Sequence, residues 1–192
     1  FLLDAAESEA ERSGARREAA AYFTLAERYV TPRRPGLIIT SGLSGSGKST
    51  IARQVAESLD AIQVRSDAVR KQLAGMTPGQ RDPSAFAQGI YHPQMTQRVY
   101  DTMLEHARVI TGSGRWAILD ATYPTPQHRS SAAGMARALG IPYAILYCRA
   151  PRAELLRRLA ARSAAGTDVS DATGAILEAQ AQHFEAPGAN EG

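Results

Sequence analysis

One stretch of the sequence contains the side chains whose types and spacing are best suited to chemistry. It reads Gly42, Leu43, Ser44, Gly45, Ser46, Gly47, Lys48, Ser49 and Thr50. This order fits the pattern G-x-x-x-x-G-K-[ST], in which glycines allow a tight turn and successive backbone N–H groups point into one concavity that can surround phosphate. Lys48 would reach the β- and γ-phosphates of a nucleotide, and Ser49 offers a hydroxyl group to Mg²⁺. The stretch, called the P-loop below, predicts a binding site for a nucleoside triphosphate.

The residues on either side of the P-loop supply the strand and the helix that this motif requires. Residues 37–40 form an unbroken apolar run, which is typical of a parallel strand buried on both faces. Ile51, Val55 and Leu59 follow at the spacing of an amphipathic helix. The competing interpretation, a Ser/Gly-rich turn that contains a lysine by chance, does not account for these flanks.

Apolar runs alternate with amphipathic stretches along the rest of the chain. Runs at 37–40, 61–64, 116–119 and 143–148 predict strands, and the segments between them predict helices. This alternation predicts an α/β fold: a parallel sheet of four to five strands with helices on both faces, as in the three-layer P-loop NTPase fold. Sheets of this kind bind ligands at the carboxyl ends of their strands, where the P-loop and the residues after the other strands are expected to meet.

Composition divides the chain into three segments. Residues 1–35 are a helical segment followed by a Pro-rich linker, and we expect them to be the end of a preceding domain. Tyr22 and Phe23 belong to a set of apolar residues at helical spacing, which predicts that one side of this helix is buried. Residues 36–186 are the P-loop domain, and residues 187–192 are expected to be a disordered tail.

The overall composition is that of a globular protein, with 44% hydrophobic and 21% charged residues. The formal net charge of +3 is too small to argue for a protein that coats nucleic acid. The single cysteine, Cys148, is expected to pack in the core in a reducing compartment, so we expect a cytoplasmic location. No apolar stretch approaches the roughly 20 residues of a membrane-spanning helix, and no membrane partner is expected.

Two aspartates follow predicted strands and are candidates for chemistry. Asp120 follows the strand at 116–119, where it would hold Mg²⁺ directly or through water; alternatively, it caps a turn. Asp67 follows the strand at 61–64, and it would either cap the short helix that begins there or act on a substrate. Arg70 lies one helical turn later, so a carboxylate and a guanidinium group would face one direction. That pairing suits an acceptor hydroxyl held next to a phosphate or another anionic group.

Two arginines on a later helix are candidates for a lid. Arg158 and Arg162 are four residues apart and share one face of the helix expected after Pro151. A polar loop at 163–168 and a further helix follow, an arrangement that resembles a lid closing over bound nucleotide. The alternative is a solvated basic face.

Four segments together resemble the small P-loop kinases, a group that includes gluconate-kinase-like proteins, polynucleotide 5′-hydroxyl kinases and the zeta-toxin family. They are residues 42–50, 65–71, 118–122 and 158–162. More closely, the chain resembles the C-terminal kinase-like domain of bacterial two-part proteins whose N-terminal half is similar to aminoglycoside phosphotransferases. The resemblance covers about residues 20–185, and it implies an upstream phosphotransferase-like domain as a partner.

The resemblance also implies roles for individual residues. In the 5′-hydroxyl kinases, an Asp directly after the second strand acts as the base toward the acceptor hydroxyl, and an Arg three residues later binds the acceptor. Asp67 and Arg70 match this pair in type and spacing, and Arg158 and Arg162 match the lid arginines by position. Kinases of this fold often have a fifth strand after the lid, whereas no apolar run follows Phe184 in this sequence.

These observations lead first to a kinase hypothesis. The protein would move the γ-phosphate of Mg·ATP to a hydroxyl acceptor, either a small molecule or a nucleic-acid 5′-hydroxyl. Lys48, Asp67, Arg158 and Arg162 would be its catalytic residues. The sequence does not identify the acceptor, but residues 75–93 and the start of the next helix are expected to shape its pocket. That region includes Tyr91 and Arg98.

Two other hypotheses belong to different classes of protein. The protein would be an ATP-binding regulatory module of a larger two-domain enzyme, with little transfer activity of its own. A signalling GTPase ranks last, because the guanine-reading motif N-K-x-D is absent and the only asparagine is Asn190.

Overall fold

The computed structural model describes residues 9–30, 34–77, 80, 89–165 and 174–191. The chain divides into two compact units, Phe1–Arg33 and Arg34–Gly192. The described residues of the first unit, 9–30, form one helix, α1 (Glu9–Val30). Taken by itself, α1 leaves Tyr22 and Phe23 exposed, so the buried side that its apolar spacing predicts is not formed within this unit.

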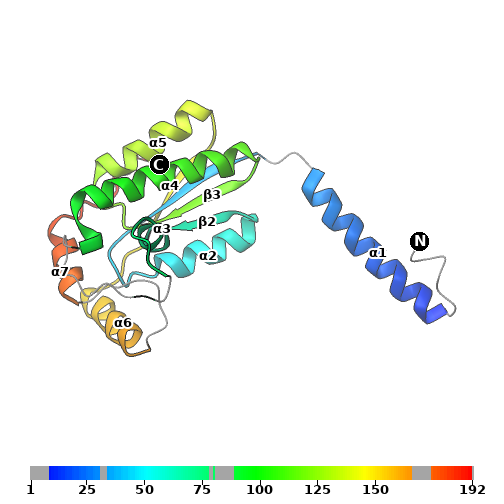
Figure 1. Ribbon diagram of the computed structural model, residues 1–192, viewed down its shortest axis with the longest axis horizontal. Helices are drawn as coiled ribbons and strands as arrows, with labels where there is room; N and C mark the ends of the chain where they lie inside the picture. The colour runs from blue at the N-terminus through cyan, green and yellow to red at the C-terminus, as the bar shows by residue number, and fades with distance from the viewer. Residues whose placement is uncertain (1–8, 31–33, 78–79, 81–88, 166–173, 192) are drawn as a thin grey trace. The chain divides into compact units, whose positions relative to one another are not determined.

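Four parallel strands form the sheet of the second unit (Figure 1). They are β1 (Gly36–Ser41), β2 (Ile62–Arg65), β3 (Trp116–Asp120) and β4 (Tyr143–Tyr147), and their spatial order is β2-β3-β1-β4. β1 has a neighbour on each side and is buried along its whole length, as its unbroken apolar sequence predicts. The predicted α/β fold with a parallel sheet is therefore confirmed, with four strands in the part of the chain that the structure describes.

Helices connect the strands and cover the sheet. They are α2 (Lys48–Leu59), α3 (Ser66–Leu73), α4 (Pro93–Gly112), α5 (Pro126–Leu139), α6 (Arg152–Ala165) and α7 (Gly174–Gln182), with a short 3₁₀ turn, η1 (Gly89–Tyr91), before α4. Local sequence explains their ends. Proline occupies the first turn of α5, and Gly140 follows its last residue in a left-handed conformation with φ of 63°. None of the helices described is long and apolar enough to cross a membrane.

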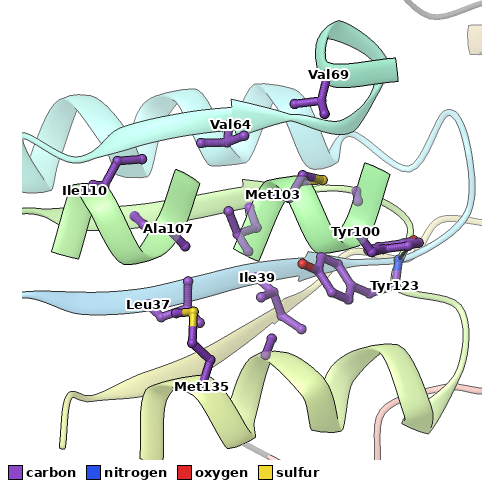
Figure 2. Close-up of a cluster of buried hydrophobic side chains, with 14 of the residues drawn as sticks. Leu37, Ile39, Val64, Val69, Tyr100, Met103, Ala107, Ile110, Tyr123 and Met135 are labelled. Atoms are coloured by element: carbon purple, nitrogen blue, oxygen red, sulfur yellow. Dashed lines mark hydrogen bonds between the residues drawn. The ribbon is translucent and has the colours of Figure 1, made fainter. Parts of the chain in front are cut away.

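The core lies on both faces of the sheet. Helices α4 and α5 cover one face and α2 covers the other (Figure 1). Alternation along β1 explains this division, because Leu37 and Ile39 point toward α4 and α5 while Ile38 packs against Ala52 of α2. Figure 2 shows the larger cluster, in which Met103 fills the space between α4 and the sheet with no exposed surface. Burial of such a side chain contributes about 1.5–3 kcal/mol.

The residues that follow α7 contact other segments of the second unit. The backbone N–H group of Glu185 donates to the carbonyl of Pro124 at 2.8 Å. The Glu191 carboxylate accepts two hydrogen bonds from Arg129, at 2.6 and 3.0 Å. Residues 187–191 thus have defined contacts, whereas the sequence predicts a disordered tail over 187–192.

Candidate active site

The P-loop connects the end of β1 to the start of α2. Gly42, Gly45 and Gly47 have φ of 141°, 82° and 93°, a region that favours glycine. The Ser46 N–H group closes the turn by donating to the carbonyl of Leu43 at 3.2 Å. The Ser46 hydroxyl oxygen is buried and has no hydrogen-bond partner among the described residues. A loop of this shape at a helix N-terminus has the donors that bind phosphate oxygens.

Lys48 lies across this loop rather than extending into solvent. Its side chain is buried, and Nζ donates to the carbonyl of Leu43 at 2.8 Å. The ammonium group is therefore held on the concave side of the loop, close to the backbone that would surround a phosphate. Burial makes this charge more effective toward an anion than it would be in water.

We expect Gly42→Ala to prevent the P-loop from forming. A Cβ atom at residue 42 would lie 2.1 Å from the carbonyl oxygen of Cys148, which is backbone and cannot rotate away. The φ of 141° is also strained for any residue with a Cβ, so the cost should be at least about 2–3 kcal/mol. Thermal unfolding of the variant should show it. Gly140→Ala is the matched control, because its φ is also positive but no atom lies within 4 Å of the added Cβ.

A cavity of about 370 Å³ opens beside the P-loop at the carboxyl edge of the sheet. Eleven of the predicted site residues line it, among them Lys48, Ser49, Asp67, Arg70, Asp120 and Arg158. Of the other predicted P-loop residues, Leu43, Ser44, Gly45, Gly47 and Thr50 also line it, while Gly42 and Ser46 do not. Tyr91 lines the cavity as predicted. Arg98 does not, because its side chain lies on the exposed side of α4.

Asp120 ends β3 and is almost completely buried. Its carboxylate accepts a hydrogen bond from Gln63 Nε2 at 2.9 Å and a longer one from the Thr40 hydroxyl at 3.4 Å. Arg65, its register partner on β2, places Nε 3.8 Å from the same carboxylate oxygen that Gln63 contacts. These donors come from neighbouring strands, so Asp120 does not act as a turn cap. Gln63 also reaches the carbonyl of Ser49 at 3.5 Å, which links Asp120 to the P-loop.

Asp67 lies in the first turn of α3 and is half-buried in the cavity wall. The residue at the cap position is Arg65, and its side chain makes no capping hydrogen bond. Asp67 is therefore two residues past the cap position, and its role in the site stays a prediction. The Asp67 charge acts on Arg70, where it raises the pKa of the guanidinium group.

Arg70 is nine-tenths buried, and burial lowers its pKa more than the Asp67 charge raises it. Nη1 donates to the carbonyl of Ile90 at 2.9 Å and to the Thr96 hydroxyl at 3.2 Å, and the guanidinium lies over the Tyr91 ring at 4.8 Å. Nε has no hydrogen-bond partner in the part of the chain that is described. The described residues thus engage Nη1 and the face of the guanidinium group, while the Nε–H group is buried without a hydrogen-bond partner among them.

Sequence reasoning missed Tyr100 and Thr122, which line the same part of the cavity. The Tyr100 hydroxyl accepts a hydrogen bond from the Tyr123 N–H group at 3.2 Å and lies 3.4 Å from the Thr122 hydroxyl. Burial raises the pKa of Tyr100, so its hydroxyl stays protonated and can donate at neutral pH. The sequence pattern did not indicate a role in the site, because Tyr100 lies at a position of α4 that predicts packing in the core.

Helices α6 and α7, called the lid below, pack beside the P-loop. Leu155 and Leu159 of α6 and Leu177 of α7 form a buried cluster with Leu43 of the P-loop. The Ser44 N–H group also donates to Gln180 Oε1 at 3.1 Å. The lid is therefore joined to the P-loop by apolar packing and by a hydrogen bond. Half of the predicted polar loop, residues 166–168, lies outside the described part of the chain, and its other half, residues 163–165, continues α6 instead of forming a loop.

Arg158 points from the lid toward the P-loop. Its Nη1 donates to the carbonyl of Gly45 at 3.4 Å, and its Nε donates to Glu154 at 2.6 Å. Hydrogen bonds from Arg157 and Arg158 lower the pKa of Glu154 to about 2, so the carboxylate stays ionised and keeps Arg158 in place at neutral pH. The backbone of Arg162 lies in α6, but its side chain is outside the described residues.

Comparison with known proteins gives a family. Residues 37–187 match the family described as AAA domain. An uncharacterized protein of Mycobacterium tuberculosis H37Rv is 30% identical over 165 residues, which are 85% of this chain and 33% of that protein. An uncharacterized protein of Mycobacterium bovis matches to the same extent. The chain thus spans about a third of the length of the curated relatives it matches.

Solved structures with the same fold include two enzymes. A gluconokinase from Sinorhizobium meliloti 1021 has a TM-score of 0.56 and 20% identity, over 82% of this chain and 79% of that chain. The Mycobacterium tuberculosis APS kinase CysC in complex with AMPPNP and APS has a TM-score of 0.58 and 23% identity, over 81% of this chain and 85% of that chain. The predicted resemblance to small P-loop kinases is confirmed, while the link to two-part proteins stays a prediction. The chain belongs to the AAA domain family and has the fold of the small P-loop kinases.

Proposed function

We propose that this protein is a kinase that transfers the γ-phosphoryl group of ATP to a hydroxyl group of an acceptor. One observation carries the proposal: a single cavity is lined on one side by Lys48 and Ser49 and on another by Asp67 and Arg70. Phosphoryl transfer needs both a phosphate site and a group that acts on the acceptor, within reach of each other. A site that only bound nucleotide would not need Asp67 and Arg70 in the same cavity.

The P-loop side suits the triphosphate of ATP. The loop has three left-handed glycines and a buried Ser46 hydroxyl without a partner, which are features that a bound phosphate would use. Mg²⁺ would be held by the Ser49 hydroxyl and, directly or through water, by Asp120, where it would neutralise charge on the β- and γ-phosphates. Lys48 would bind the same phosphates, and Arg158 and Arg162 would approach them from the lid.

The other side suits the acceptor. Asp67 would accept the proton of the acceptor hydroxyl as that oxygen forms a bond to the γ-phosphorus and the bond to the β-phosphate oxygen breaks, releasing ADP. Arg70 lines the cavity, and its planar guanidinium group matches the geometry of a carboxylate or phosphate. We therefore expect an acceptor that has both a hydroxyl group and an anionic group.

Consumption of ATP in the presence of an acceptor panel tests this proposal. The panel contains sugars, nucleosides, 5′-hydroxyl oligonucleotides and aminoglycosides, with glucose and gluconate as a matched neutral and anionic pair. At least one acceptor should increase ADP release and become phosphorylated, and EDTA should stop the reaction. ATP binding without acceptor-dependent turnover anywhere in the panel would contradict the kinase proposal.

That contrary result would favour the second candidate, an ATP-binding regulatory module attached to another enzyme. The observation behind it is the length of the relatives, of which this chain spans about a third. An upstream phosphotransferase-like domain would be the partner of such a module. The P-loop and the lid would then bind ATP to report its concentration, and Asp67 would be dispensable.

A further inference from the structure

Arg129 is a buried arginine that does not line the cavity, yet its guanidinium group makes four hydrogen bonds. Arg129 of α5 has only 1% of its surface exposed. Its Nη1 donates to the carbonyls of Tyr123 at 3.0 Å and Glu185 at 2.8 Å. Its Nε and Nη2 donate to the two carboxylate oxygens of Glu191. A guanidinium group satisfied in this bidentate way is held rigidly, and loss of one partner would leave a buried charge uncompensated.

The two carbonyls that Arg129 holds belong to two different walls of the cavity. Tyr123 lies between Thr122 and Pro124, both of which line the cavity after β3. Glu185 directly follows His183 and Phe184, which line it after α7. The Glu185 N–H group also donates to the carbonyl of Pro124. Arg129 therefore joins, from behind, two segments that are about 60 residues apart in the sequence.

The backbone at Tyr123 shows that this wall is under constraint. Tyr123 has φ of 41°, a left-handed conformation that costs a residue with a side chain about 1–3 kcal/mol. Its carbonyl accepts hydrogen bonds from both Arg129 and the Ser41 hydroxyl, the latter at 3.2 Å. The neighbouring carbonyl of Thr122 accepts from the Gly42 N–H group at 3.1 Å. A shift of this segment would therefore be transmitted to the first residue of the P-loop.

The second wall is also built around an aromatic contact. Phe184 stacks on Tyr147 at the end of β4, with ring centroids 6.1 Å apart and an angle of 16° between the ring planes. Gln180, one turn earlier in α7, accepts a hydrogen bond from the P-loop N–H group of Ser44. This wall is thus continuous with the P-loop, whereas Asp67 and Arg70 come from α3, after β2 at the opposite end of the strand order. It adjoins the phosphate site on the side away from the acceptor.

We propose that Arg129 and Glu191 form a clamp that positions the wall after α7, together with the segment after β3, for bound nucleotide. Arg129 is a positioning residue: it does not contact the ligand, but it fixes the carbonyls behind Thr122 and Phe184. The inference rests on the proposed nucleotide site and adds to it residues that no motif indicates. It implies that breaking the clamp weakens nucleotide binding more than acceptor binding, because the wall after α7 adjoins the P-loop while Thr122 lies beside Tyr100 on the acceptor side.

The test compares the affinity of wild-type protein and Glu191→Gln for MgADP by isothermal titration calorimetry. Measurements are made at a temperature where circular dichroism shows each protein fully folded. The variant keeps the size of the side chain but removes the charge that pairs with Arg129. We expect the dissociation constant to rise about tenfold, which is the usual cost of losing a partner that orients a binding group. KM for ATP should rise with it, and by a larger factor than KM for the acceptor.

Asp60→Asn is the matched control. Asp60 pairs with Arg115 at 2.8 Å, and both residues lie at the amino ends of the strands, away from the cavity. This substitution also removes the carboxylate of an arginine pair without touching the clamp, but the pair is partly exposed, so it controls for the change in charge and not for the larger loss of stability expected at the buried Arg129. Its MgADP affinity should equal that of the wild type. If Glu191→Gln does not fold, Glu191→Asp replaces it, because the shorter carboxylate cannot reach both guanidinium nitrogens in the same geometry.

Two contrary results are distinguishable. Equal MgADP affinity of wild type and folded Glu191 variants, even with a lower melting temperature, would overturn the clamp and leave the proposed function standing. Absence of MgADP binding by the wild type itself would overturn the proposed function and the clamp with it.

A double variant with Arg129→Lys adds a further check. If the two residues act as one unit, the double variant should bind MgADP no more weakly than the weaker single variant.

Discussion

Replacement of Lys48 by methionine should reduce kcat for phosphoryl transfer by about 10²–10³-fold, the usual effect of removing one group that stabilises transition-state charge. The reason is the position of the ammonium group. Nζ is buried on the concave side of the P-loop and donates to the carbonyl of Leu43, so it is already next to the predicted phosphate site. Methionine keeps most of the aliphatic chain, which limits the change to the loss of charge. Steady-state kinetics with saturating ATP measures the effect.

Arg53→Met provides the control for Lys48→Met. Arg53 is on the same helix, α2, but its side chain is exposed and lies outside the cavity. Its removal changes the net charge by the same amount and should leave kcat unchanged. A Lys48→Met protein with normal kcat and a raised KM for ATP would show that Lys48 binds ground state and transition state equally, contrary to the role proposed here.

Much of the fold could be predicted because its signals are local. The amphipathic helix predicted from Ile51, Val55 and Leu59 is observed over Lys48–Leu59, because the P-loop fixes its start and its apolar residues recur at helical spacing. Thr125 and Pro126 mark the start of α5, and Gly140 marks its end, as the sequence indicates. The common edge that joins the P-loop, Asp67 and Asp120 also follows from the alternation of strands and helices.

What the sequence did not predict depends on contacts between distant segments. The partners of Asp120 are side chains on β1 and β2, and they are brought to it by strand register, which no local pattern indicates. Arg129 looks like an ordinary surface residue of a helix, yet its carboxylate partner is Glu191, in a stretch whose Pro, Gly and Asn content suggested disorder. A buried charge of this kind is recognisable only when its partner is known.

Substitution of Asp67 by asparagine should reduce acceptor-dependent transfer by about 10²–10⁴-fold while MgADP affinity stays within about twofold of the wild type. Asparagine is nearly the same size and can still accept a hydrogen bond, but it cannot take the proton of the acceptor hydroxyl. Asp67 is in α3 and not in the P-loop, so the phosphate site should be unaffected. Asp101→Asn is the control, since Asp101 is exposed on α4 and accepts from Gln97.

The pH dependence separates a base from a residue that only holds the acceptor. If Asp67 takes the proton, kcat/KM of the wild type falls at acidic pH as the carboxylate is protonated, and the residual activity of Asp67→Asn lacks that acidic limb. If Asp67 only orients the acceptor, the variant raises KM for the acceptor and keeps the pH profile of the wild type. Because Arg70 loses a neighbouring negative charge in this variant, the anionic acceptor should bind no more weakly. A rise in its KM together with an unchanged pH profile would therefore rule out the assignment of Asp67 as the base.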